Sequence, residues 1–272
     1  MHDEDRGLAH DLERLLHHRR QVLQWITAAI VLPACSDDQD DSAGGTVGDD
    51  TGVADDSGLT DDSGVETCTQ VPEETAGPYP GDGTNGADAL ELSGIVRSDI
   101  RTSIAPGKGT ADGVALTLTI EVVAVDGCTP LEGYAVYVWH CDRLSKYSMY
   151  TAPEATYLRG VQVTDAKARA TFTSIFPGCY PGRWPHINFE VFPSLKSTTD
   201  AKNIAITSQL AFPEKSCAEV YAEAGYEASV TNLENISLAT DSEFSDDEAV
   251  HQMATVTGSV EKGYQATLRI AV

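Results

Sequence analysis

The feature that most constrains this fold is a series of short segments in which apolar and polar residues alternate. In the clearest of them, residues 115–125, single threonines separate Leu116, Leu118 and Ile120. Successive side chains on a strand point to opposite faces of the sheet, so this alternation predicts a half-buried strand. The predicted strands are residues 89–96, 115–125, 135–140, 159–164, 170–174, 186–192, 205–210, 253–260 and 264–272.

Turn signals separate these segments, and only residues 217–224 are predicted to form a helix. Asp126-Gly127, Pro177-Gly178 and Lys262-Gly263 are dipeptides that favour tight turns. Many short strands with little helix are typical of an antiparallel β-sandwich or barrel. We therefore predict an all-β fold of one of these two kinds, with one short helix, over residues 67–272.

Residues 1–35 have the pattern of a signal peptide. An apolar run, residues 22–34, follows Arg19-Arg20 and ends at Cys35. The run is too short to span a bilayer, and small residues before a cysteine are typical of a lipoprotein cleavage site. The arginine pair resembles a twin-arginine export signal, and the alternative is an ordinary signal peptide. We predict an exported, extracytoplasmic protein that is attached to a bacterial membrane only through a lipid at Cys35.

Residues 36–66 form an acidic, low-complexity tract. It holds eleven of the 42 acidic residues and no lysine or arginine, within a chain of net charge −24. Such a tract buries too little apolar surface to fold, so we predict a disordered linker; calcium binding by its aspartates is the alternative. Residues 67–272 are also acidic, which argues against nucleic acid as a partner.

The cysteines predict disulfide bonds in an oxidising compartment. With Cys35 lipidated, five of the six cysteines remain. We favour the pairs Cys68–Cys128 and Cys179–Cys217, with Cys141 buried on a strand, although the sequence does not fix this pairing. No Cys-x-x-Cys or Cys/His spacing indicates a zinc site.

One stretch, residues 176–189, concentrates residues that carry chemistry. Within the predicted strand 186–192, His186 and Asn188 share one face, and apolar residues occupy the other. Polar groups on such a strand need partners. One explanation is a half-solvated edge strand. The other is a metal site with Tyr180 and His186 as ligands and Arg183 beside them.

Several motifs in this order resemble the intradiol ring-cleavage dioxygenases, the family of protocatechuate and catechol dioxygenases. They are residues 75–79 (Thr-Ala-Gly-Pro-Tyr), 97–100 (Arg-Ser-Asp-Ile), 138–142, 146–148 (Lys-Tyr-Ser), 158–165 and the stretch 176–189. The resemblance extends from about Glu73 to Phe212. It implies a β-sandwich of the intradiol dioxygenase type and a non-haem ferric iron.

The resemblance also implies roles for individual residues. Tyr147 and Tyr180 match the two tyrosine ligands of the iron, and His186 matches the first histidine of a His-x-His pair. Where the family has the second histidine, this chain has Asn188, whose neutral amide oxygen is a weaker donor. Arg183 matches the arginine that stabilises the carbanion-like substrate, and Gln209 matches a glutamine that supports the site. We interpret the remaining strand histidine, His140, as a packed, hydrogen-bonded residue.

The implied reaction is ring cleavage of a catechol-type aromatic diol by dioxygen, as in the breakdown of aromatic compounds. Phenolate oxygens are hard donors that favour Fe(III), and a fixed guanidinium stabilises developing negative charge. Taken singly, Tyr147 and Tyr180 also fit rim aromatics, and Arg183 fits a surface ion pair. The rival function is a non-catalytic, surface-anchored binding module with a degenerate metal site; a third is a structural lipoprotein. The particular diol and the oligomeric state are not predicted.

Overall fold

We describe residues 67–272 of the protein from a computed structural model. The predicted signal peptide, residues 1–35, and the predicted linker, residues 36–66, lie outside the described residues. Among residues 67–272, neither α-helix combines the length and the apolar content that crossing a membrane requires.

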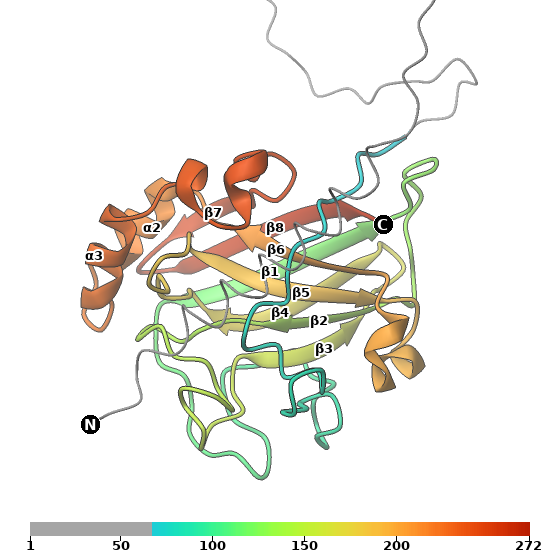
Figure 1. Cartoon of the computed structure of the whole chain (residues 1–272), viewed down its shortest axis with the longest axis horizontal. Helices are drawn as coiled ribbons and strands as arrows, with labels where there is room; N and C mark the ends of the chain where they lie inside the picture. Colours follow the sequence, from blue (N-terminus) through green and yellow to red (C-terminus); the bar gives the residue numbers. More distant parts are fainter. Residues whose placement is uncertain (1–66) are drawn as a thin grey trace, which may run out of the picture. The chain divides into compact units, whose positions relative to one another are not determined.

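Two four-stranded sheets make up the domain (Figure 1). The first sheet has the order β4 (Arg169–Ile175), β1 (Ala115–Val123), β8 (Gly263–Ala271), β7 (Thr255–Ser259). The second has the order β3 (Arg159–Val163), β2 (Ala135–Trp139), β5 (His186–Phe192), β6 (Ile206–Ala211). The predicted β-sandwich is therefore confirmed. One neighbouring pair, β1 and β8, runs parallel, and the other pairs are antiparallel.

The apolar positions of the alternating strands meet between the two sheets. Leu118 and Ile120 of β1 belong to the same buried cluster as Val138 of β2 and Ile187 and Phe189 of β5. Each such side chain stabilises the fold by about 1.5–3 kcal/mol on leaving water. The alternation that predicted the strands thus becomes the core of the sandwich.

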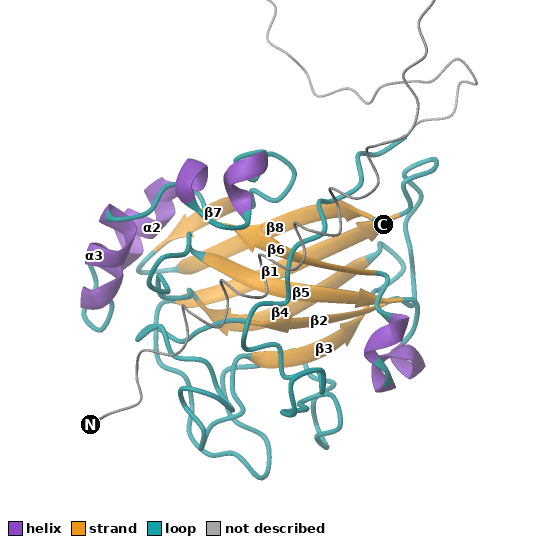
Figure 2. Cartoon of the chain, in the orientation of Figure 1, coloured by secondary structure: helices purple, strands orange, loops and turns teal. Residues whose placement is uncertain are grey.

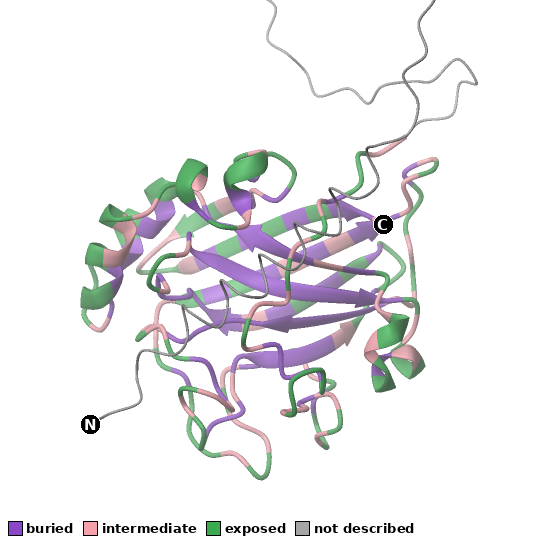
Figure 3. Cartoon of the chain, viewed as in Figure 1, coloured by how far each residue is buried: buried purple, intermediate pink, exposed green. Residues whose placement is uncertain are grey.

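The outer face of the second sheet is also covered. Tyr137 and Trp139 point away from the core and pack with residues of the loops 76–104 and 141–149. Strands β2 and β5 are consequently buried along their whole length (Figure 3). Because β5 lies between β2 and β6, a half-solvated edge strand does not explain its polar residues.

Two predictions of secondary structure need correction (Figure 2). The helix predicted at 217–224 is α2 (Glu214–Tyr221), and a second helix, α3 (Glu227–Glu234), was not predicted. The predicted strand 89–96 is wrong, since this segment consists mainly of turns. The carboxylate of Asp88 accepts hydrogen bonds from the backbone of Leu90 and Glu91, which holds the chain in a turn.

Four short 3-10 helices complete the described elements. They are η1 (Leu195–Thr199), η2 (Ala201–Asn203), η3 (Leu238–Thr240) and η4 (Phe244–Asp246).

The cysteines agree with one predicted pair and contradict the other. Cys68 and Cys128, which are 60 positions apart in the sequence, form a disulfide. Cys179 and Cys217 are buried free thiols, so their predicted pairing is wrong. The Cys179 thiol is directed instead at the carbonyl oxygen of Arg183, 3.4 Å away. Cys141 is buried and free, but it lies just after β2 rather than on a strand.

Candidate metal centre and active site

The candidate site lies on the outer face of the second sheet, where β5 begins. Asn188 of β5 is paired in the sheet with Trp139 of β2 on one side and Gln209 of β6 on the other. His186 and Asn188 are both buried, at 5% and 3% exposure. The period of two residues that placed them on one face in the sequence holds in the structure.

His186 is oriented like a metal ligand. Its Nδ1 lies 2.6 Å from the carbonyl oxygen of Trp184, so Nδ1 carries the proton and donates it there. Nε2 is then unprotonated and can accept a bond through its lone pair, and a backbone carbonyl on the other ring nitrogen is the usual support for a ligating histidine. Burial, reinforced by the charge of Arg183, lowers the pKa of His186 to about 3. His186 is therefore neutral at ordinary pH, as a ligand must be.

Tyr147 lies in the loop between β2 and β3, and its hydroxyl approaches Nε2 of His186. The hydroxyl oxygen lies 3.4 Å from His186 Nε2, although the two residues are 39 positions apart. Burial, with a smaller contribution from Cys141, raises the pKa of Tyr147, whereas Arg183 and a hydrogen bond from Asn188 lower it. The metal-free site therefore holds a protonated phenol, and a metal ion would have to displace that proton.

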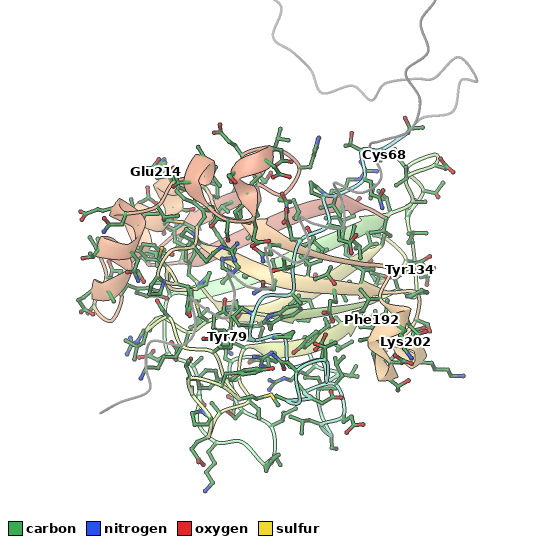
Figure 4. All side chains as sticks on the ribbon, in the orientation of Figure 1. Cys68, Tyr79, Tyr134, Phe192, Lys202 and Glu214 are labelled. Atoms are coloured by element: carbon green, nitrogen blue, oxygen red, sulfur yellow. A yellow bond between two sulfur atoms is a disulfide. The ribbon has the colours of Figure 1, made fainter. Side chains whose placement is uncertain are left out.

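Tyr180 is the more exposed of the two predicted tyrosine ligands. Its ring packs edge-on against Tyr147 with 5.8 Å between centroids. Its hydroxyl lies 3.3 Å from the hydroxyl of Tyr79, a residue for which the sequence predicted no role. Tyr79, labelled in Figure 4, also packs against Tyr147 at 4.9 Å. The structure thus gathers three tyrosines around the start of β5.

Asn188 lies on the same face of β5 as His186. Its amide nitrogen donates to the carbonyl oxygen of Trp139 at 3.3 Å, and its side chain is close enough to Tyr147 to lower the pKa of that phenol. Residue 188 therefore points at the candidate centre.

Arg183 is fixed beside the centre by two groups. Its Nη2 donates to Gln209 Oε1 at 2.6 Å, and Nε and Nη2 both donate to the carboxylate of Asp241. Gln209 is held in turn by its own Nε2, which donates to the carbonyl oxygen of Thr75. The predicted pair Arg183 and Gln209 is therefore in direct contact, and Asp241 is an addition that the sequence gave no reason to expect.

The side chains present fit a ferric ion. Two phenols, one neutral imidazole and one amide oxygen form a set of hard and intermediate donors. Among residues 67–272, no group of three or more His, Cys, Asp or Glu side chains could hold a metal ion. The candidate centre is thus built around tyrosine, and two of its donors, Tyr147 and His186, are close enough to share one ion.

His140 takes no part in this centre. It is buried, with Nδ1 at 2.8 Å from the Cys141 carbonyl oxygen and Nε2 at 2.8 Å from the Ser174 hydroxyl. Burial lowers its pKa to about 4. Its prediction as a packed, hydrogen-bonded histidine is correct.

The sequence and fold match known dioxygenases. Residues 96–196 match the family model described as "Dioxygenase". An intradiol ring-cleavage dioxygenase from Tetranychus urticae is 25% identical, with a TM-score of 0.58, over 75% of this chain and 94% of that one. The dioxygenase domain of a carbohydrate-binding fusion protein from Streptomyces sp. SirexAA-E is 24% identical, with a TM-score of 0.48, over 75% and 98%. No curated protein matches the chain. The resemblance stated from the motifs is confirmed.

Proposed function

We propose that this chain, which has the fold of the intradiol ring-cleavage dioxygenases and matches a dioxygenase family model over residues 96–196, cleaves a catechol-type aromatic diol with dioxygen at a ferric iron. The observation that carries the proposal is the hydrogen-bond approach of the Tyr147 hydroxyl to the unprotonated Nε2 of His186, at 3.4 Å. Tyr180 and Asn188 lie beside this pair.

Tyr147, Tyr180, His186 and Asn188 would hold the iron. When bound, a ferric ion acts as a Lewis acid and template that binds the diol and prepares its ring for oxygen attack. His186 contributes a neutral donor whose orientation the Trp184 carbonyl fixes. Tyr147 contributes a buried phenol that loses its proton as it binds.

Tyr180 would also move a proton, and Arg183 would stabilise charge. Tyr180 is partly exposed and lies within hydrogen-bonding distance of Tyr79. As a phenolate that had lost its proton in holding iron, it would accept a proton from an incoming diol and become a phenol again. Among residues 67–272, no hydrogen bond uses Nη1 of Arg183, while Nε and Nη2 are engaged. Nη1 is therefore available to donate to negative charge that develops on the substrate.

The colour of the iron-loaded protein tests this proposal. Purified full-length protein, reconstituted with ferric iron, is expected to bind about one equivalent and to be red, because tyrosinate ligands absorb visible light through charge transfer to the iron. With catechol and oxygen it should release a ring-opened diacid. Colourless protein without stoichiometric iron would refute the metal centre and favour the non-catalytic binding module. Red protein that leaves catechol intact would retain the metal site but refute the reaction.

Substitution of Asn188 by histidine is a further prediction. Imidazole is a stronger donor than an amide oxygen, and the side chain at 188 lies on the same face of β5 as His186. The Asn188→His variant should therefore retain iron about tenfold more tightly against a chelator. Asn203→His, an exposed substitution, serves as the control. Equal or weaker retention by Asn188→His would show that residue 188 does not contact the metal.

We also propose that the protein acts outside the cytoplasm, tethered by a lipid at Cys35. The Cys68–Cys128 disulfide supports an oxidising compartment. Mass spectrometry of protein purified from membranes should find a diacylglycerol on Cys35. An unmodified Cys35, or a chain that retains residues 1–34, would contradict the anchor.

A further inference from the structure

The side chain of Asp241 is completely buried and contacts the arginine of the candidate site. Asp241 lies between η3 and η4, outside the segment that matches the dioxygenase family model. Its side chain has 0% exposure, and that of its partner Arg183 has 16%. A buried carboxylate is costly unless it is fully hydrogen-bonded, so its partners indicate its role.

Three backbone amides hold Asp241 in place. Oδ2 accepts from the N–H of Trp184 at 2.6 Å, and Oδ1 accepts from Glu243 at 2.9 Å and Phe244 at 3.1 Å. These amides come from both sides of the pair, since Trp184 follows Arg183 directly and the other two follow Asp241. The carboxylate is thereby fixed independently of the guanidinium that it binds.

Asp241 then fixes the guanidinium of Arg183. Nε donates to Oδ2 at 2.9 Å and Nη2 donates to Oδ1 at 3.1 Å, the two-pronged geometry that sets the plane of an arginine. The guanidinium carbon also lies 5.9 Å from the centre of the Phe244 ring. Nη2 makes a second bond, to Gln209. With this edge occupied, the opposite amino group, Nη1, has a fixed direction.

We propose that Asp241 is a positioning residue that aims Nη1 of Arg183 at the reacting diol. The inference rests on the proposed function, because it assumes that Arg183 faces a substrate that gains negative charge. Asp241 acts only through Arg183 and touches no reacting atom. An arginine free to rotate would lose part of its stabilisation of that charge, since catalytic stabilisation depends on donors that are oriented in advance.

The orientation can be measured without iron or substrate. In metal-free, full-length protein with 15N-labelled arginine, Arg183 Nε–H should give an NMR signal that exchanges slowly with water, assigned by its loss in Arg183→Lys. In Asp241→Asn, which offers one acceptor oxygen instead of two, this exchange should be about tenfold faster or more. Asp99→Asn is the matched control because Asp99 binds Arg101 in the same two-pronged way at an exposed site. It should leave the Arg183 signal unchanged.

Activity supplies the second readout. In the iron-loaded enzyme, Asp241→Asn should lower kcat by about 10²-fold while the affinity for catechol under nitrogen stays within about twofold. In an Arg183→Ala background, Asp241→Asn should lower kcat no further.

Two results would overturn the inference. The first is fast exchange of Arg183 Nε–H in the wild type, which is decisive even if Asp241→Asn does not fold. The second is a loss of kcat from Asp241→Asn that is fully additive with Arg183→Ala. If the wild type cleaves no diol while the NMR contrast holds, the proposed function fails and the positioning of Arg183 stands.

Discussion

Replacement of Tyr147 by phenylalanine is expected to remove iron binding and the red colour together. The substitution deletes one oxygen from a residue that is only 4% exposed and leaves the ring in its cluster with Tyr79. That oxygen is the one that approaches His186 Nε2. We expect the affinity for ferric iron to fall by more than about 100-fold, because groups that only support a ligand already contribute about 10–100-fold. Iron content and visible absorbance after dialysis against a chelator measure the effect.

A second tyrosine serves as the control for this experiment. Tyr134 precedes β2 at the end opposite the candidate site, and Figure 4 labels it there. Tyr134→Phe deletes the same oxygen from a half-buried ring and should keep both iron and colour. The Tm of Tyr147→Phe should stay close to that of the wild type in the metal-free state, since no apolar packing is lost. If Tyr147→Phe protein retains one equivalent of iron with unchanged absorbance, Tyr147 is not a ligand.

Replacement of Arg183 by lysine is expected to lower kcat by about 10²–10³-fold without removing the iron. Lysine keeps the positive charge but has no planar fork, so it cannot bind Asp241 through two nitrogens while a third faces the substrate. Loss of one oriented donor to developing charge costs about 10²–10³ in rate. Steady-state oxygen uptake with catechol gives kcat, and the absorbance band gives the iron content of the same sample.

The same substitution at an exposed arginine isolates the effect of the site. Arg101 forms a two-pronged ion pair with Asp99 near the surface, and Arg101→Lys should leave kcat within about twofold. A loss of iron in Arg183→Lys would show that Arg183 is needed to keep the metal centre intact. An unchanged kcat would show that Arg183 does not take part in the reaction.

Much of the fold could be predicted because a half-buried strand shows a local alternation of apolar and polar residues. The alternation in residues 115–125 and 186–192 matches β1 and β5 within two residues. The strand prediction for residues 89–96 is wrong because the apolar residues there belong to a turn that the Asp88 side chain stabilises. Helix α3 was missed because residues 227–234 carry only one buried side chain, that of Ser229, and so have no apolar period.

The pairing of cysteines was predictable only in part. Cys68 and Cys128 were paired correctly, but nothing in the spacing of Cys179 and Cys217 shows whether their sulfur atoms meet. A disulfide requires a specific distance between the two side chains, and packing between distant segments sets that distance.

The sequence by itself determined that His186 and Asn188 share one face of a strand, because side chains on a strand repeat every two residues. Motif order also placed Tyr147, Arg183 and Gln209 among the candidate residues. Only the tertiary structure decided that the Tyr147 hydroxyl reaches His186 from 39 positions away, that Tyr79 lies beside Tyr180, and that Asp241 holds Arg183 from 58 positions away. The physical reason is that these contacts depend on loops folded over the outer face of a buried sheet. No local period in the chain encodes that arrangement.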